Sequence, residues 1–210
     1  MNHPRGHQPE AIRSVLETSL KALHPHKIRD TLREINKLHG EGKFQFFGLS
    51  NFAAWELVEI IHICKANNWI RPTYYQTRYN AISRALEQEL IPASRKYGLR
   101  IVTYNALAAG FFAGKISKED AGSKHMLQKW YLNDSHFEAM KIVRAASEKA
   151  NIPLGEIGYR WLQHHSTLSP DDGIICGVST VAQLKLNIAS SEKGPLPEEI
   201  VGHDEPLCWR

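Results

Sequence analysis

The sequence has few cysteines and no long apolar run, and both absences exclude classes of protein. Cys64, Cys176 and Cys208 are the three cysteines among 210 residues, an odd number of widely separated positions. A disulfide framework needs paired cysteines and a zinc site needs closely spaced ligands, so we interpret all three as packing residues and predict no metal site. No stretch reaches the roughly 20 apolar residues of a membrane-spanning helix, and Met1 to Glu10 has no apolar signal core. We therefore expect a soluble, cytoplasmic protein with no membrane partner.

Dense positive charge is also lacking. The chain has 26 Lys and Arg against 22 Asp and Glu, a formal net charge of +4, and its basic residues are spread along the sequence. Nucleic-acid-binding proteins gather such residues into a patch, so we expect no nucleic-acid partner. With 42% hydrophobic residues and no repeat or low-complexity tract, the composition is that of one globular domain.

One stretch organises the rest of the chain. Phe44 to Leu49 is too short and too apolar for a surface helix, and it is followed by the polar pair Ser50 and Asn51. Ligands of parallel α/β folds bind at the C-terminal ends of strands, so these two residues are candidates for contact with a small molecule. The alternative is that Ser50 caps the helix that follows.

The same strand and helix pattern recurs. Strands are predicted at residues 44–49, 72–76, 99–105 and 173–179. They alternate with apolar-faced helices, which implies right-handed βαβ units and a parallel sheet. Helices are predicted at residues 11–23, 30–39 with Asp30 as its cap, 55–66, 135–150 and from Pro153 onward.

Five ordered motifs carry a resemblance. They are Gly48-Leu49-Ser50-Asn51; Tyr75-Gln76 before Tyr79-Asn80; Tyr104-Asn105-Ala106-Leu107 with Gly110 and Gly114-Lys115; Arg160 to Ser166; and Gly177-Val178-Ser179 followed by Gln183 and Asn187. In this order they resemble the aldo-keto reductases, most of all the aflatoxin aldehyde reductase branch. The similarity runs from about Pro9 to Pro197.

The resemblance implies an α/β fold in the form of a partial (β/α)8 TIM barrel, with about four parallel strands from its second half. We expect a polar, disordered start at residues 1–9, a truncated NADP-dependent oxidoreductase domain at 10–200 and an irregular tail at 201–210. No segment resembles the family's first three strands or the strand that carries its catalytic His. Residues 24–29 are interpreted as a polar loop, with His24 or His26 as the alternative remnant of that His. An open barrel favours self-association.

The resemblance also implies a cofactor site for NADPH. Ser50, Asn51 and Gln76 match the residues that hydrogen-bond the nicotinamide carboxamide, and Tyr104 matches the aromatic that stacks on the ring. The alternative for each is a strand-end residue that satisfies backbone groups or packs in the core. The remaining residues in the predicted set are Asn105, Leu107, Gly110 and Lys115 around the pyrophosphate, and Gly177, Ser179, Gln183 and Asn187 around the adenosine 2′-phosphate.

Two hypotheses of function remain. The first is NADPH-dependent reduction of a small-molecule carbonyl compound by a chain that is inactive alone, because no segment carries the family's catalytic Asp, Tyr, Lys and His. We nominate no catalytic residue, and we interpret Arg160 as structural. The alternative is a non-catalytic NADP(H)-binding or interaction protein. The polar segment from Ile116 to Asn133, with Trp130 and Tyr131, resembles the family's variable loop near the cofactor and substrate mouth.

Overall fold

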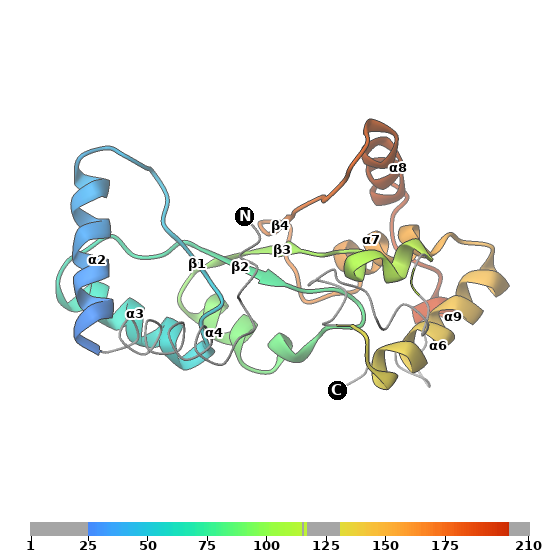
Figure 1. Ribbon diagram of the computed structural model, residues 1–210, viewed down its shortest axis with the longest axis horizontal. Coiled ribbons are helices and arrows are strands. Elements are labelled where there is room, and N and C mark those ends of the chain that lie inside the picture. The colour runs from blue at the N-terminus through green and yellow to red at the C-terminus, as the bar shows by residue number, and fades with distance from the viewer. Residues whose placement is uncertain (1–24, 115, 117–130, 202–210) are drawn as a thin grey trace, which may run out of the picture. The chain divides into compact units, whose positions relative to one another are not determined.

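The computed structural model describes residues 25–114, 116 and 131–201, and the side chains from residue 28 onward (Figure 1). Within these limits the chain forms two compact units, residues 25–48 with 52–73 and residues 49–51 with 74–201. The predicted disordered start, the predicted helix at 11–23 and residues 202–210 of the predicted tail lie outside the described residues. No helix in the described part is both long and apolar enough to cross a bilayer.

The first unit consists of two helices and their connections. Helix α2 spans Pro25–Gly40 and α3 spans Ala54–Ala66. The Asn36 side chain accepts a hydrogen bond from the Ile70 amide at 2.9 Å, and Arg29 donates to the Asn67 side chain at 2.9 Å, so polar contacts join the helices to the segment after α3. The core residues of this unit are Leu32, Leu57, Ile60, Ile61 and Cys64.

The N-terminal part of α2 corrects two predictions. The polar loop predicted for residues 24–29 is wrong from residue 25 onward, because α2 begins at Pro25. Proline is favourable in a first turn, where its missing N–H would have no helical partner and its fixed φ suits the helix. Asp30 is therefore not a cap, and it forms an exposed ion pair with Arg33 at 2.9 Å.

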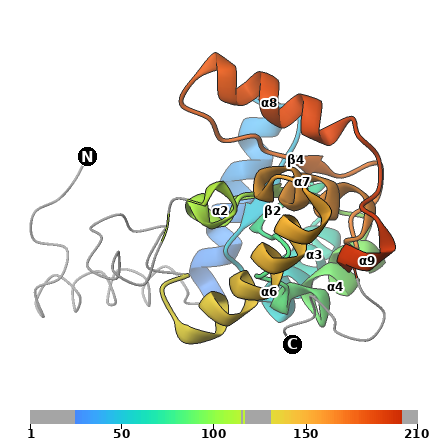
Figure 2. The ribbon, with the colours of Figure 1, turned by 90° about the vertical axis from the view of Figure 1, so that its right-hand side faces the viewer.

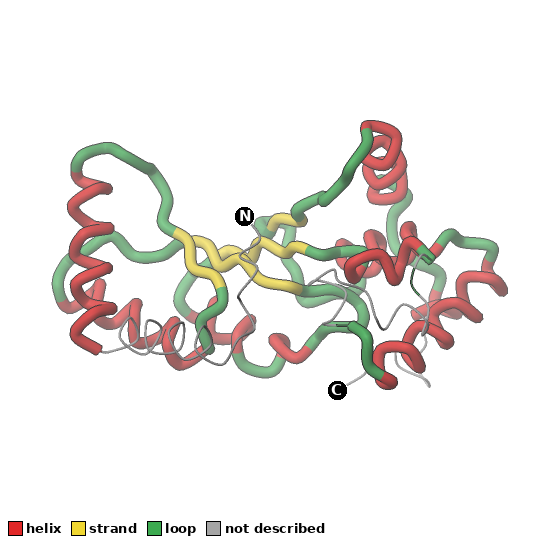
Figure 3. The backbone as a smooth tube through the Cα atoms, viewed as in Figure 1, coloured by secondary structure: helices red, strands yellow, loops and turns green. Residues whose placement is uncertain are grey.

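The second unit contains a four-stranded sheet in the order β1-β2-β3-β4 (Figure 3). The strands are β1 (Gly48–Ser50), β2 (Tyr74–Arg78), β3 (Arg100–Tyr104) and β4 (Gly173–Ile174). Strand β3 is parallel to both β2 and β4, so the predicted parallel α/β sheet is confirmed.

Strands β1 and β4 are much shorter than predicted, whereas β3 is shorter by only one residue at each end. Residues 44–47 lie outside β1, and residues 175–179 lie outside β4. The Ile175 amide still donates to the Thr103 carbonyl at 2.7 Å, but the ladder ends there. Strands β1 and β4 each have a single neighbour in the described sheet, so nothing on the other side extends the pairing.

Helices and 3-10 turns complete the second unit. The predicted helix at 135–150 and the one after Pro153 are confirmed, and α8 follows β4 through a long connection (Figures 1 and 2). The elements are η1 (Ala85–Glu87), α4 (Leu90–Lys96), η2 (Ala108–Ala113), α6 (Asp134–Ala150), α7 (Leu154–His164), α8 (Val181–Ser191) and α9 (Glu198–Val201). The largest fully buried side chains here include Tyr75, Tyr79, Phe112, Tyr131 and Trp161.

Arg160 has the structural role predicted for it. It is buried on α7 and donates to the Glu156 carboxylate at 2.7 Å and to the Gly194 carbonyl at 2.7 Å, as well as to the Pro195 carbonyl. Glu156 also accepts from Lys193 at 2.7 Å. These contacts fix the segment after α8 against α7.

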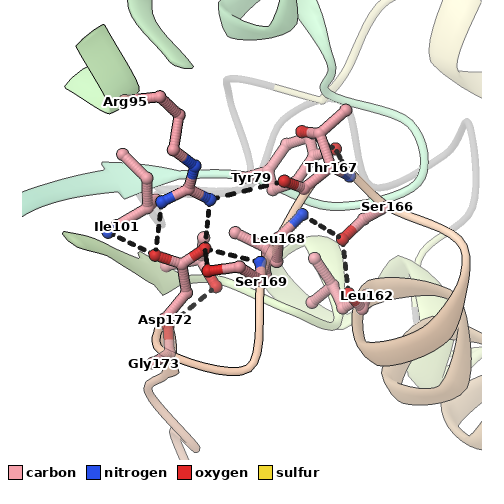
Figure 4. Close-up of polar contacts among 11 residues, drawn as sticks. Tyr79, Arg95, Ile101, Leu162, Ser166, Thr167, Leu168, Ser169, Asp172 and Gly173 are labelled. Atoms are coloured by element: carbon pink, nitrogen blue, oxygen red, sulfur yellow. Dashed lines mark hydrogen bonds and ion pairs between the residues drawn. The ribbon is translucent and has the colours of Figure 1, made fainter. Parts of the chain in front are cut away.

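A buried carboxylate joins the N-terminal ends of β3 and β4 (Figure 4). Asp172, whose side chain is 1% exposed, accepts hydrogen bonds from the Ile101 amide at 2.6 Å and the Ser169 amide at 2.7 Å. It also pairs with the two terminal nitrogens of Arg95, on α4. The Asp172 side chain therefore joins α4, β3 and the loop that precedes β4.

The electrostatics of Asp172 make this junction sensitive to acid. Burial alone raises the pKa of its carboxyl, but hydrogen bonds from Arg95 and the two amides outweigh burial, so the pKa lies below its ordinary value. Because this carboxyl has a lower pKa in the folded chain than in the unfolded chain, it stabilises the fold at pH values above the unfolded-state pKa. That stabilisation is lost as the pH falls through the folded-state pKa.

We expect Asp172→Asn to lower the free energy of unfolding by about 2 kcal/mol at pH 7, the usual scale for a hydrogen-bonded charge. The difference from wild type should shrink as the pH falls toward 2, because wild-type Asp172 then becomes neutral. Urea denaturation followed by circular dichroism measures both values. The exposed neighbour provides the control, since Asp171→Asn should change little at either pH. A difference that does not depend on pH would contradict this account.

The turn after β3 stores backbone strain. Ala108 and Ala109 adopt φ values of 47° and 54°, in the left-handed region that disfavours any residue with a Cβ atom. We expect Ala109→Gly to raise the free energy of unfolding by about 1 kcal/mol. Ala113→Gly, at an exposed position of the same turn without positive φ, should lower it. Thermal and urea unfolding of both variants provide the test. If Ala109→Gly lowers the free energy of unfolding, the claim that Ala109 is strained would be refuted.

Candidate functional site

The predicted nicotinamide residues lie toward the C-terminal ends of neighbouring strands. Ser50 ends β1 and Tyr104 ends β3, whereas Gln76 lies two residues before the end of β2. In the parallel register Gln76 is opposite Val102, and Arg78 is opposite Tyr104. Side chains alternate across a strand, so Gln76 and Tyr104 project from the same face of the sheet.

The two faces of β2 and β3 differ in burial. Tyr75, Ile101 and Thr103 project from the other face and are buried. Gln76 is exposed and Tyr104 is half-buried on theirs. The packing of this unit therefore uses one face of these strands and leaves the predicted site face accessible.

Ser50 does not serve the helix that follows it. Helix α3 is capped at Ala53, whose amide donates to the Glu56 carboxylate at 2.6 Å. The alternative that Ser50 caps this helix is therefore wrong. Its hydroxyl instead accepts a hydrogen bond from the Asn51 side chain at 3.1 Å, and Asn51 adopts a φ of 64°. The polar pair thus forms a local unit just past the strand end.

The loop after β3 is held by its own first residue. The Asn105 side-chain oxygen accepts from the Ala109 amide at 2.8 Å, and Gly110 adopts a φ of 106°. Leu107 lies against α7, where a Cβ atom at Gly158 would approach its side chain to 3.3 Å. Lys115, the remaining residue predicted for this loop, lies outside the described residues.

Two residues absent from the predicted set anchor this loop. Asn80, which follows β2, donates to the Asn105 carbonyl at 3.0 Å and to the Tyr131 hydroxyl at 2.8 Å. Asn105 donates to the same hydroxyl at 3.0 Å. Asn80 had a signal in the sequence, since it follows a strand as Asn105 does. Tyr131 had only an indirect signal, because its segment resembles the family's variable loop near the cofactor mouth but has no pattern that assigns Tyr131 to these strand ends.

The Tyr131 hydroxyl is an anchor with little acidity. Burial, the largest influence, raises its pKa to about 12, and the hydrogen bonds from Asn80 and Asn105 only partly offset burial. The Arg78 guanidinium lies over its ring, 5.5 Å from the centroid. Tyr131 therefore joins the ends of β2 and β3 while keeping its proton.

The predicted adenosine segment surrounds the start of α8. Thr180 caps this helix by accepting from the Gln183 amide at 3.2 Å, and the Gln183 side chain accepts from the Ser179 amide at 2.8 Å. The two hydrogen bonds satisfy backbone N–H groups at Gln183 and at Ser179, just before the cap. Gly177 and Ser179 are exposed just before it. The N-terminus of an eleven-residue helix and its dipole favour a phosphate group there.

Asn187 faces a different way from Gln183. It is buried and donates to the Tyr159 hydroxyl at 3.1 Å and to the Cys176 sulfur at 3.4 Å. Together with Leu162 and Ile188 these residues line a cavity of about 580 Å³ between α7, α8 and β4. The structure thus groups Ser179 with Gln183 and turns Asn187 toward α7.

Comparison with known proteins agrees with the motifs. Residues 2–203 match the model of the aldo/keto reductase family. Aflatoxin B1 aldehyde reductase member 2 of Mus musculus is 39% identical over 92% of this chain and 62% of its own length. Aldo-keto reductase family 7 member A3 of Homo sapiens is 39% identical over 92% of this chain and 68% of its own. The chain thus spans about two thirds of the length of these relatives.

A solved structure supports the fold. The glycerol dehydrogenase of Gluconobacter oxydans superposes with a TM-score of 0.64 at 22% identity, covering 92% of this chain and 62% of that one. The parallel α/β fold and the family predicted from the five motifs are both confirmed. This chain belongs to the aldo/keto reductase family.

Proposed function

We propose that the chain carries the NADPH-binding part of a carbonyl reductase and does not reduce aldehydes at a useful rate by itself. The observation that carries the proposal is the common face of Gln76 and Tyr104 beside the polar end of β1. An accessible face at the C-terminal side of a parallel sheet is where α/β folds hold their ligands. The relatives named as aflatoxin B1 aldehyde reductases point to an aldehyde or ketone as substrate.

Hydride transfer sets the demands on this face. The nicotinamide must present one side of its ring to the carbonyl carbon, and the carbonyl oxygen must gain a proton as the hydride arrives. Ser50, Asn51 and Gln76 would hydrogen-bond the carboxamide and fix the rotation of the ring. Tyr104 would stack on the ring.

The start of α8 would hold the other end of the cofactor. The Thr180 cap and the hydrogen bond from the Ser179 amide to the Gln183 side chain order the first turn, and Ser179 is exposed. Lys185 is exposed on the same helix and adds positive charge. An additional phosphate is what distinguishes NADPH from NADH, so these features favour NADPH.

The pKa values of three buried tyrosines indicate whether they could donate the proton to the carbonyl oxygen. Burial is the largest cause of a raised pKa at Tyr79, Tyr131 and Tyr159, and the value reaches about 12 at the first two. A catalytic acid at neutral pH needs a pKa near the working pH. These three side chains are therefore poor proton donors at neutral pH.

We expect NADPH to bind more tightly than NADH in a fluorescence titration of the folded chain. Tyr104→Ala should weaken NADPH binding about tenfold because it removes the stacked ring. Tyr97→Ala is the matched control, since Tyr97 ends α4 near the start of β3 rather than its end, and it should leave the affinity unchanged. Absence of NADPH binding by a chain that is folded by circular dichroism would remove the site assignment.

We also expect little NADPH oxidation with a reactive aromatic aldehyde. General acid catalysis typically contributes about 10²–10⁴-fold. No segment resembles the family's catalytic motifs, so we expect this chain to fall short of its relatives by at least that factor. Absorbance of the reduced nicotinamide measures the rate. Turnover within a few fold of a longer relative, lost in His24→Ala or His26→Ala, would refute this proposal. A mixture of this chain with the longer relative that shows no more turnover than the relative alone, although the chain binds NADPH, would favour a non-catalytic NADP(H)-binding protein.

A further inference from the structure

A positively charged side chain lies on the same sheet face as the predicted nicotinamide residues. Arg78 comes two residues after Gln76 in β2, and in the parallel register it is opposite Tyr104. Because side chains alternate along a strand, all three project from one face of the sheet. Arg78 is half-buried at the last position of β2, at the end of the strands where the cofactor is proposed to bind. It is absent from the predicted cofactor set.

An aromatic ring positions the guanidinium of Arg78. The central carbon of this group lies over the Tyr131 ring, 5.5 Å from its centroid. Such a cation–π contact is an electrostatic attraction to the ring and does not require a hydrogen bond from an N–H group. A guanidinium carries five N–H donors in a planar fork, more than one partner can use, and the fork matches the geometry of a phosphate. The contact with Tyr131 therefore leaves Arg78 suited to hold an anion.

At neutral pH the positive charge beside Tyr131 belongs to Arg78 rather than to the neighbouring histidine. His136 packs edge-on against Tyr131, with ring centroids 5.2 Å apart. Burial, the largest influence, and the charge of Arg78 lower the pKa of His136, so its imidazole is neutral at pH 7.

Tyr131 also links Arg78 to the loop after β3. The Tyr131 hydroxyl accepts a hydrogen bond from the Asn105 side chain at 3.0 Å. Asn105 begins the loop that is predicted to surround the pyrophosphate of the cofactor. One tyrosine thus contacts both the guanidinium and the first residue of this loop.

The backbone amides in the middle of this loop already have partners. The Ala108 amide donates to the Asn105 carbonyl at 2.9 Å, and the Ala109 amide donates to the Asn105 side chain at 2.8 Å. The Gly110 amide donates to the Leu107 carbonyl at 3.0 Å. These amides could bind an anion only by giving up hydrogen bonds that hold the turn. A phosphate beside this part of the loop therefore needs donors from a side chain.

We propose that Arg78 binds the pyrophosphate of the cofactor. The inference rests on the proposed function and adds a residue of β2 to the pyrophosphate end of that site. A guanidinium can hold two phosphate oxygens at once, in charge-assisted hydrogen bonds. NADPH and NADH share the pyrophosphate, so Arg78 contributes affinity for both and does not discriminate between them.

Fluorescence titration of the folded chain with NADPH and with NADH tests the proposal. Arg78→Met removes the charge but keeps an unbranched side chain beside Tyr131, and it should weaken the binding of both cofactors by the same factor, about tenfold. Arg78→Lys keeps the charge without the fork and should lose less affinity. The matched control is Arg100→Met, which should leave both affinities unchanged, because Arg100 projects from the same face but begins β3. Circular dichroism establishes that each variant is folded.

The possible results separate this inference from the proposed function. Unchanged cofactor affinity in Arg78→Met would overturn the inference alone, whereas a folded wild-type chain that binds neither cofactor would overturn both. Weaker binding of NADPH with unchanged binding of NADH would place Arg78 at the 2′-phosphate. Unchanged cofactor affinity with weaker binding of benzoate to the NADPH complex would place it at a substrate carboxylate. Either of these two results would also overturn the pyrophosphate assignment.

Discussion

The hydrogen-bonded carboxylate of Asp172 is the constraint on which the second unit depends. It lies one residue before β4 and accepts from the Ile101 amide in β3, so it sets how the last strand enters the sheet. Strand β4 has two residues, too few for its own ladder to define its position. The Arg95 pair ties α4 to the same point. The N-terminal ends of β3 and β4 are therefore occupied by stabilising contacts.

The opposite ends of the strands are organised differently. There Asn80, Asn105 and Tyr131 form a small polar network that orders a strained turn, and the side chains predicted to touch the cofactor project beside it. Strain of this kind persists where surrounding contacts hold it in place, and it is common at ligand sites. In parallel barrels the N-terminal ends of the strands serve stability and the C-terminal ends hold ligands, and the proposed site follows the same arrangement.

Most of the architecture could be predicted from the sequence because local signals agreed with one another. The alternation of apolar strands and amphipathic helices predicted the parallel sheet, and Pro153 marked the start of α7. Pro25 carried the same signal, but the interpretation of residues 24–29 as a loop concealed it. Strand lengths could not be predicted, since they depend on how many neighbours each strand has in space.

The candidate site was predictable where a residue type and a strand end coincide. Ser50 and Tyr104 end their strands, whereas Gln76 lies two residues before the end of β2, and their contact with a cofactor stays a prediction. Tyr131 does not follow this rule, because it reaches the site through tertiary packing from a segment without periodicity. Asn187 shows the opposite difficulty. It lies one helical turn after Gln183, so the sequence predicted that both side chains contact the cofactor. In the structure the Asn187 side chain instead donates to the Tyr159 hydroxyl.

The central claim is that the C-terminal ends of these strands and the start of α8 bind NADPH. Hydrogen exchange with and without saturating NADPH tests it most directly, because it locates the protected amides along the chain. The account predicts protection at residues 104–114 and 177–184 and none around Asp172. Protection confined to the Asp172 end, or no protection by a cofactor shown to bind, would contradict it.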